Sequence, residues 1–229
     1  MKTCYAMIIT AHPDDAEFGI AGTVAKWTRE GKEVVYIVCT NGNKGTDNPG
    51  ISPEKLAQIR EQEQMAAAKV LGVSDVIFLR HDDQTLEDTP EFRKEIVRLI
   101  RTYRPELVAT CDPYRRYIWH RDHRITGQVV LDAVFPYSRD YLAYPDLLRQ
   151  GLQPHKVKEV LTWGSEQPDY FLNITDTYEI KMAALYCHQS QLESMPPEWE
   201  QRIKARYQTA PKELGYLWSE AFHRVEILW

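Results

Sequence analysis

The stretch Tyr5–Thr10, YAMIIT, followed at once by Ala11–Asp15, AHPDD, decides the fold prediction. A short apolar run is typical of a buried strand, and here it breaks directly into a polar turn. A helix-like stretch follows over about residues 18–30, and Gly31 ends it, as a glycine beyond a helix C-terminus commonly does. This order of strand, loop and helix predicts the repeating unit of a parallel sheet.

The same alternation continues along the first two-thirds of the chain. Apolar runs rich in β-branched residues predict further strands, and helical spacing with capping signals predicts further helices. The expected strands cover residues 33–40, 75–79 and 107–111, and the expected helices cover residues 52–71, 89–104 and 123–135. Later in the chain we expect a strand over 157–163, helices over 175–191 and 196–209, and an edge strand over 222–229.

We therefore predict an α/β fold, with a Rossmann-like, mostly parallel sheet and helices on both faces. Right-handed crossovers favour the order 3-2-1-4 for the first four strands. No repeat, low-complexity tract or linker divides the chain, so residues 1–229 are expected to form a single domain. Its core is expected over about residues 1–135, and an irregular C-terminal part, about 136–229, is expected to complete the sheet, the pocket rim or subunit contacts.

The composition excludes several classes of protein. A net charge of −5 argues against a nucleic-acid-binding surface. The four cysteines are widely spaced and form no CxxC pair, which indicates reduced thiols. No stretch reaches the roughly 20 apolar residues of a membrane helix, and the start of the chain lacks the pattern of a signal peptide. We therefore expect a cytoplasmic protein that binds neither nucleic acid nor a membrane.

Two polar clusters follow the first and the fourth predicted strands. Residues Ala11–Asp15 form the first cluster, and His120–His123, HRDH, form the second. In the order 3-2-1-4 these two strands are neighbours, and ligands bind where the loops after such strands meet. The topology is therefore expected to bring the two clusters into one site, although they lie far apart in the sequence.

The residue types in these clusters indicate a catalytic metal ion. A catalytic zinc takes three protein ligands and keeps one position for water. His12 and Asp15 on one loop, and His123 on the facing loop, are the expected ligands. Two histidines and one carboxylate also match the ligands of non-haem iron oxygenases, so the ligand types leave Fe²⁺ or another divalent ion open.

The remaining polar residues of the two clusters have expected catalytic roles. Asp14 lies beside the expected ion, where a general base for the attacking water belongs. His120 is placed to stabilise or protonate a tetrahedral intermediate, and Asp122 is placed to orient one of the histidines. A dinucleotide site is excluded, because the turn lacks GxGxxG and its carboxylates would repel a pyrophosphate.

At these residues the sequence resembles the PIG-L/LmbE-like deacetylases. The resemblance rests on AHPDDAEFGIAGT (Ala11–Thr23) and HRDHR (His120–Arg124). It extends to TNGNKG (Thr40–Gly45), to a helix pattern over residues 60–72, and to KMAALYCHQSQ (Lys181–Gln191). It covers about residues 5–191 and implies a Rossmann-like fold, one zinc ion and hydrolysis of an N-acetyl group, typically on a glucosamine unit.

The resemblance implies the same three zinc ligands and the same base as the spacing does. It also implies that His120 assists the oxyanion or the leaving amine. Arg121 stands where the family commonly has proline, and it adds a cation near the expected pocket rim.

Three further residues are expected to bind substrate. Arg60 heads the helix pattern and is expected to reach a sugar hydroxyl or an acidic aglycone. Asp83 follows the third strand at the same edge of the sheet, where a carboxylate can bind sugar hydroxyls. His188 lies in the last of the similar stretches, and the resemblance places it near the pocket.

The predicted function is zinc-dependent hydrolysis of the N-acetyl group of an N-acetylglucosamine-type sugar or glycoside, which releases acetate and a free amine. Three alternatives stay open: a metal-dependent amidohydrolase acting on a non-sugar N-acyl small molecule, a catalytically silent sugar-binding homologue, and an iron-dependent oxygenase. The presence of Asp14 beside all three expected ligands argues against the silent homologue, because binding needs no base. Some family members assemble into trimers or hexamers, so the resemblance leaves a homo-oligomer open.

Overall fold

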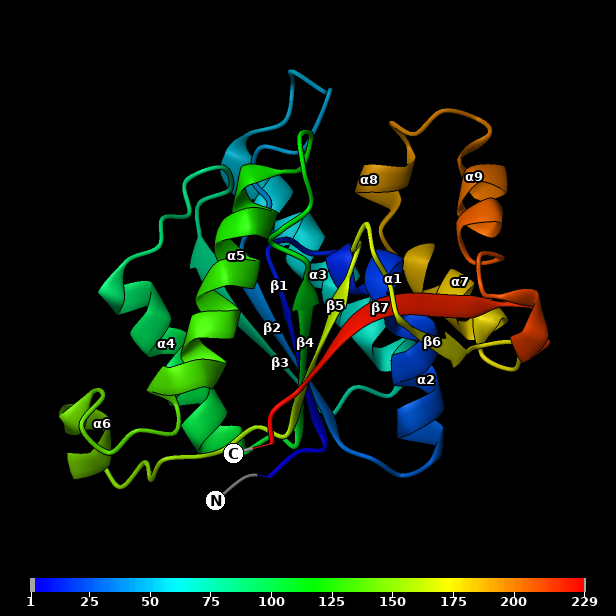
Figure 1. Ribbon diagram of the computed structural model, residues 1–229. Coiled ribbons are helices and arrows are strands. Elements are labelled where there is room, and N and C mark those ends of the chain that lie inside the picture. The colour runs from blue at the N-terminus through cyan, green and yellow to red at the C-terminus, as the bar shows by residue number, and fades with distance from the viewer. Residues whose placement is uncertain (1–2, 229) are drawn as a thin grey trace.

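The computed structural model describes residues 3–228, and within that range the strands form one seven-stranded sheet (Figure 1). The strands are β1 (Ala6–Thr10), β2 (Val34–Thr40), β3 (Asp75–His81), β4 (Leu107–Cys111), β5 (Glu159–Trp163), β6 (Tyr170–Asn173) and β7 (Ser219–Glu226). Their order is β3-β2-β1-β4-β5-β7-β6. Strands β1 to β5 pair in parallel, and β7 runs antiparallel to both β5 and β6. The mostly parallel sheet and the order 3-2-1-4 are therefore confirmed.

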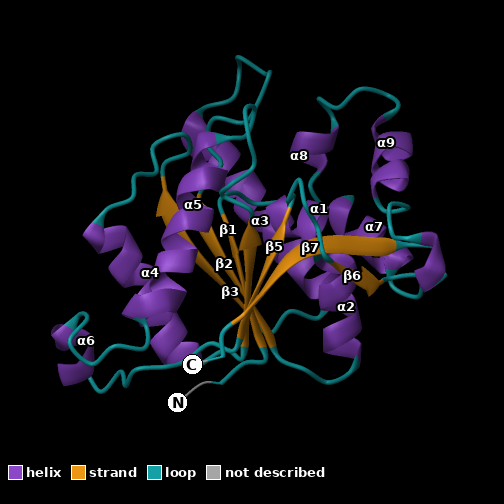
Figure 2. Ribbon diagram, in the orientation of Figure 1, coloured by secondary structure: helices purple, strands orange, loops and turns teal. Residues whose placement is uncertain are grey.

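Helices connect the parallel strands and cover both faces of the sheet, as predicted (Figure 2). The helices are α1 (Asp15–Gly19), α2 (Ala21–Arg29), α3 (Pro53–Leu71), α4 (Pro90–Tyr103), α5 (Arg121–Asp132), α6 (Pro145–Arg149), α7 (Tyr178–Leu185), α8 (Gln189–Leu192) and α9 (Trp199–Arg206), with the short segments η1 (Ala133–Tyr137) and η2 (Lys212–Leu214). Helices α4 and α5 cover one face through residues such as Ile96 and Val129. Helices α2, α3 and α7 cover the other through residues such as Val24, Leu71 and Ala184.

The central strands and the long helix α3 form where local sequence favours them. Strand β2, VVYIVCT, is buried along its whole length because helices cover both of its faces. Helix α3 begins after Ser52, whose hydroxyl accepts a hydrogen bond from the N–H of Lys55 at 3.2 Å. It ends at Gly72, whose φ of 74° is the left-handed conformation that glycine adopts without strain. This helix carries two of the side chains that surround the site.

The helix expected over residues 18–30 is two helices, α1 and α2, separated at Ile20. The break leaves backbone groups that distant side chains satisfy. The ammonium of Lys181 donates to the carbonyl oxygen of Glu17 at 2.8 Å, and the hydroxyl of Tyr207 donates to that of Phe18. Local spacing could not show this break, because its hydrogen-bond partners come from the far end of the chain.

The C-terminal part differs from the prediction in the arrangement of its strands and in its helices. Residues 219–226 form β7, but this strand lies between β5 and β6 and is not an edge strand. The edge is β6, which the sequence analysis missed, and the last expected strand residue, Trp229, lies outside the described residues. The helix expected over 175–191 is divided into α7 and α8. Position in the sheet is decided by pairing between distant segments, which the local pattern does not contain.

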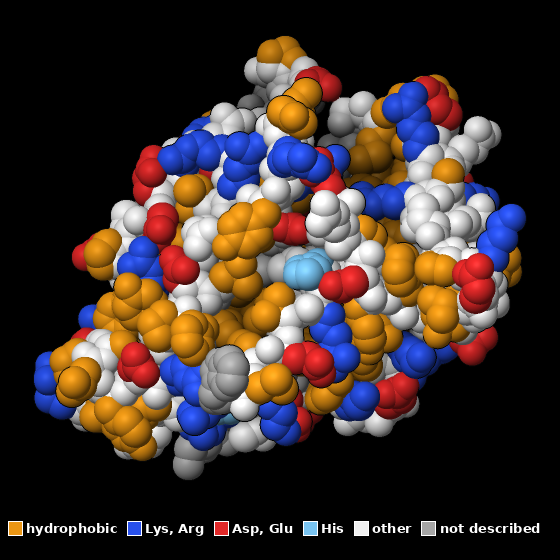
Figure 3. All heavy atoms as spheres, in the orientation of Figure 1, with side chains coloured by type: hydrophobic (Ala, Val, Ile, Leu, Met, Phe, Trp, Pro, Cys, Tyr) orange, Lys and Arg blue, Asp and Glu red, His pale blue; other side chains and the backbone are white. Residues whose placement is uncertain are grey.

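Exposed hydrophobic side chains lie both in the loop after β4, where Tyr117 and Ile118 expose 87% and 92% of their surface, and in the segment that follows α5. Phe135, Tyr141 and Leu142 expose 51%, 64% and 91% of their surface. In Figure 3 hydrophobic side chains gather at the lower left, over α6 and the adjoining end of α5. Over residues 3–228 no helix has the length and apolar content needed to cross a membrane.

Candidate metal centre and active site

The two polar clusters meet at the C-terminal ends of β1 and β4, toward the top of Figure 1. Strand β1 pairs with β2 on one side and β4 on the other, so the direction of the chain connections reverses there. His12 and Asp15 follow β1 directly, and His120 is the N-cap of α5. Residues from the two loops therefore face each other at the point where open α/β sheets bind their ligands.

Three side chains, His12, Asp15 and His123, converge on one another. His12 Nδ1 lies 3.2 Å from His123 Nε2 and 3.5 Å from Asp15 Oδ2. Asp15 Oδ1 lies 2.9 Å from His123 Nε2. The ring of His12 is buried, and the other two side chains are half-buried. Two imidazole nitrogens and a carboxylate thus share a small, largely enclosed volume.

This arrangement fits a divalent cation. Two ligand nitrogens about 2.0–2.1 Å from a tetrahedral zinc lie about 3.3 Å apart, close to the separation of the two histidine nitrogens. On its other side His12 Nε2 lies 3.0 Å from Asp83 Oδ1, a contact in which the ring nitrogen donates. In a neutral ring this leaves the Nδ1 lone pair directed at His123 and Asp15, the arrangement of a metal-ligating histidine held by a carboxylate.

The charges around His12 also favour a cation. Burial opposes its protonation, but hydrogen bonds to Asp122, Asp15 and Asp83 hold its pKa well above the ordinary value. For Asp15, burial is again outweighed, because the rings of His123 and His12 hold the pKa of that carboxyl well below its usual range. An enclosed site with this many carboxylates attracts positive charge.

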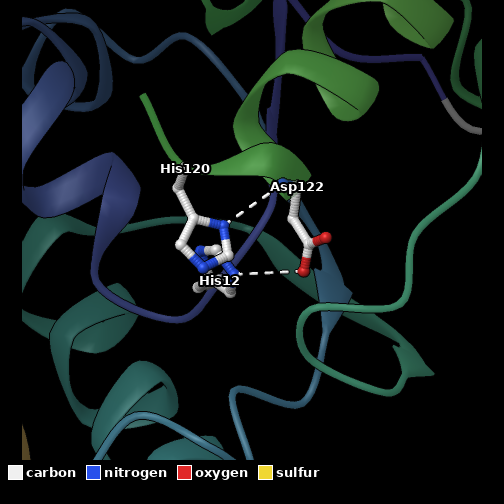
Figure 4. A group of neighbouring side chains, drawn as sticks. All are labelled: His12, His120 and Asp122. Atoms are coloured by element: carbon white, nitrogen blue, oxygen red, sulfur yellow. Dashed lines mark hydrogen bonds and ion pairs between the residues drawn. The ribbon is translucent and has the colours of Figure 1, made fainter. Parts of the chain in front are cut away.

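A second group, His12, His120 and Asp122, also brings three possible metal-binding atoms together (Figure 4). Two of its possible metal-binding atoms, Asp122 Oδ2 and His120 Nδ1, already accept hydrogen bonds, however. Asp122 Oδ2 accepts from the N–H of Gln84 at 2.6 Å and lies 3.5 Å from His12 Nε2. His120 Nδ1 accepts from the N–H of Asp122 at 3.2 Å. This group is therefore better suited to orienting the His12 ring than to holding an ion.

Asp14 lies between the two cluster residues His12 and Asp15 and has an unusual backbone. Its φ of 90° is left-handed, which costs a residue other than glycine about 1–3 kcal/mol. Its Oδ2 accepts from Arg60 Nη2 at 3.2 Å. Burial raises the pKa of Asp14 to about 6, although the Arg60 guanidinium opposes this shift. A carboxylate with a raised pKa is a better proton acceptor near neutral pH than an ordinary aspartate.

His120 is the exposed member of the site. Its ring lies edge-on to the ring of His12, with a centroid separation of 4.5 Å. Burial of part of the ring, with the nearby rings of His12 and His123, lowers the pKa of His120. A neutral ring whose Nδ1 accepts from the Asp122 N–H carries its proton on Nε2. His120 therefore has a hydrogen-bond donor to offer to a ligand.

The three expected substrate-binding residues lie near the site and are buried in the structure. Arg60, Asp83 and His188 expose only 3%, 3% and 0% of their surface. The guanidinium of Arg60 is occupied by Asp14 and by the carbonyl oxygens of residues 13 and 42, Asp83 holds His12, and His188 contacts Glu17. In the structure each of these side chains contacts other residues of the site or of its surroundings, and their binding to substrate stays a prediction.

The contacts made by two further residues, Gln64 and Arg121, could not be predicted from the sequence. Gln64 Oε1 accepts from the N–H of Asp14 at 3.0 Å, and the only signal for it is its spacing of four residues from Arg60 on one helix face. Arg121, expected as a cation near the rim, binds Glu87 Oε1 at 2.7 Å and the carbonyl oxygen of Leu86. It therefore ties the start of α5 to the loop after β3.

The family model described as PIG-L, GlcNAc-PI de-N-acetylase, matches residues 7–134, which is over half of the chain. This chain belongs to the PIG-L family. The PIG-L chain is 35% identical, over 96% of its length and 82% of the relative's, to a diacetylchitobiose deacetylase from Thermococcus kodakarensis. It is 29% identical, over 87% of its length and 89% of the relative's, to a probable N-acetyl-alpha-D-glucosaminyl L-malate deacetylase 2 from Bacillus subtilis.

The fold of this PIG-L protein matches that of a solved deacetylase. The N,N′-diacetylchitobiose deacetylase from Pyrococcus horikoshii, in complex with an inhibitor, superposes with a TM-score of 0.91 at 30% sequence identity. The superposition covers 97% of this chain and 84% of that one. The likeness therefore includes the C-terminal part as well as the region that the family model matches.

Proposed function

We propose that this PIG-L protein is a zinc-dependent deacetylase that hydrolyses the N-acetyl group of an N-acetylglucosamine-type sugar or glycoside. The observation that carries the proposal is the convergence of His12, Asp15 and His123 at the switch point, with Asp14 beside them. The names of the relatives support the substrate class, since they describe deacetylases of N-acetylated sugars.

In this proposal His12, Asp15 and His123 hold the zinc ion. When bound, zinc supplies Lewis-acid chemistry, because it lowers the pKa of water and polarises a carbonyl oxygen. Asp83 fixes the ring of His12 by accepting from its Nε2, so that the other ring nitrogen stays available.

Asp14 is the proposed general base. Arg60 occupies its Oδ2, so Oδ1 is the oxygen that accepts a proton from the attacking water. The same carboxyl then returns the proton to the departing amine, so the products are acetate and a free amino sugar. The pKa of Asp14, raised to about 6 by burial, suits a group that must both accept and release a proton.

His120 is the proposed donor to the developing oxyanion. Its Nε2–H stabilises negative charge on the acetamide oxygen, while the N–H of Asp122 holds its Nδ1. Removal of one such donor typically lowers kcat about 10²–10³-fold.

We further propose that residues 1–229 act as one catalytic domain and that the protein works in the cytoplasm. The sheet supports the first point, since β5 of the C-terminal part pairs with β4 of the core. The second is supported by the free thiols of Cys4, Cys39, Cys111 and Cys187, because disulfides are rare in the cytosol.

Acetate release from N-acetylglucosamine, diacetylchitobiose, and acidic and inositol glycosides of N-acetylglucosamine tests the proposal. We expect release that a chelator abolishes and zinc restores, and a rate about 10²–10⁴-fold lower in the metal-loaded Asp14→Asn variant. Release from simple N-acyl amines but from none of the sugars would favour an amidohydrolase of non-sugar substrates. No release from any compound by the zinc-loaded protein would overturn the proposed activity.

A further inference from the structure

The backbone of Asp14 is held in place by a residue from another helix. A φ of 90° is sparsely populated by residues with a side chain, so the surrounding structure must maintain it. The N–H of Asp14 donates to Gln64 Oε1 of α3 at 3.0 Å. Arg60, one turn earlier on the same helix, binds the carboxylate of Asp14 and the carbonyl oxygen of Pro13. Helix α3 thus holds both the peptide and the side chain of the proposed base.

The amide of Gln64 can take only one orientation in this setting. The N–H of Asp14 is a donor, so the amide atom that faces it must be the oxygen. The amide nitrogen then donates to Glu17 Oε1 at 3.0 Å. A flipped amide would place two donors face to face at Asp14 and two acceptors face to face at Glu17. Glu17 therefore determines which atom Gln64 presents to Asp14.

His188 completes this chain of contacts from the C-terminal part of the protein. Its Nε2 lies 3.1 Å from Glu17 Oε2, and the nearby carboxylate raises the pKa of His188 although burial opposes the shift. Glu17, Gln64 and His188 are all fully buried, so bulk water cannot replace a lost partner. The contacts run without interruption from the start of α8 through α1 and α3 to the turn after β1.

We propose that Gln64, oriented by Glu17 and His188, is a positioning residue that sets the reactive geometry of Asp14. The inference rests on the proposed function, in which Asp14 Oδ1 accepts the proton. A displacement of about 1 Å of a catalytic group can lower the rate about 10²-fold. Loss of the Gln64 contact is therefore expected to lower kcat, and to leave KM and the bound zinc unchanged, because Gln64 contacts no expected metal ligand side chain.

Exchanging the side chains of Glu17 and Gln64 tests whether their contacts position Asp14. Gln64→Glu removes the amide donor and places a second carboxylate against Glu17 at nearly unchanged volume. When Glu17→Gln is added, the hydrogen bonds are restored with the donor reversed. The carboxylate at position 64 then accepts from both the Asp14 N–H and the amide at position 17, whose oxygen accepts from His188. The double variant keeps the composition and net charge of the wild type.

We expect kcat to fall about 100-fold in Gln64→Glu and to return to within about fivefold of the wild type in the double variant. Zinc content and KM should stay at wild-type values in both. Gln64→Met, which adds no charge, is expected to show the same loss of kcat, and it replaces Gln64→Glu if that variant does not fold. Ile96→Val, in the core on the opposite face of the sheet, is the control for lower stability and should keep the wild-type kcat at a temperature well below unfolding.

A kcat of Gln64→Glu within twofold of the wild type would overturn the proposal. So would a folded, zinc-loaded double variant that stays as slow as the single one. Hydrogen exchange of the Asp14 amide gives a readout that needs neither substrate nor metal. We expect this amide to exchange at least about tenfold faster in Gln64→Met than in the wild type. If the wild type releases no acetate, the proposed function fails, and the exchange rates alone decide: equal rates would overturn the positioning role, and faster exchange in the variant would support it.

Discussion

The substitution Lys181→Met is expected to destabilise this protein strongly. Lys181 Nζ lies 2.6 Å from Glu220 Oε1, and both side chains are fully buried. The carboxylate of Glu220 also accepts from the N–H groups of Gly22 and Thr23, at 2.9 and 2.8 Å, so it is held at the start of α2. Methionine fills a similar volume but leaves that carboxylate without its cation.

The expected magnitude follows from the burial of the pair. Removal of one partner of a buried ion pair costs about 3–5 kcal/mol, because the remaining charge cannot be hydrated. For a chain of this length each kcal/mol shifts Tm by about 2–4 °C, so Tm should fall by about 6–20 °C. The carbonyl oxygen of Glu17 also loses its donor, which favours the upper part of this range.

Thermal unfolding followed by circular dichroism at pH 7 measures this shift. Lys158→Met is the matched control, since Lys158 and Glu106 form an ion pair of 2.7 Å with both side chains mostly exposed. Exposed pairs contribute about 0–1 kcal/mol, so the control should lower Tm only slightly. Adding Glu220→Gln to Lys181→Met should recover part of the loss, because no uncompensated charge remains. Equal Tm shifts for the two lysine variants would refute the argument from burial.

Three further outcomes are expected for the metal centre. Asp14→Asn should lower kcat about 10²–10⁴-fold and keep one zinc per chain by elemental analysis; a matching loss of zinc would contradict its role as a base that is not a ligand. His12→Ala should lose both zinc and activity, because the ring carries one of the three converging nitrogen and oxygen ligands, and retained stoichiometric zinc would exclude it from the centre. His120→Ala should lower kcat about 10²–10³-fold with little change in KM or zinc, and steady-state kinetics showing a change in KM alone would indicate binding instead of oxyanion stabilisation.

The amino-acid sequence alone was enough to predict the parallel part of the sheet and to identify the residues of the two polar clusters. Continuous apolar runs such as VVYIVCT can form strands only where both faces are covered, and Ser52 and Gly72 mark the ends of a helix through backbone chemistry. These signals are local, so they can be interpreted without knowing the structure of the rest of the chain. With the rule for right-handed crossovers, they predicted that the loops after β1 and β4 meet.

The tertiary structure decided what each buried polar side chain contacts. Arg60, Asp83 and His188 were expected to bind substrate, and the sequence did not show that each is buried against a partner from another element. The break between α1 and α2, and the place of β7 inside the sheet, likewise depend on partners from distant segments. Local periodicity does not indicate a hydrogen-bond partner that lies more than a hundred residues away. A buried polar group forms hydrogen bonds with the groups that the completed fold places next to it.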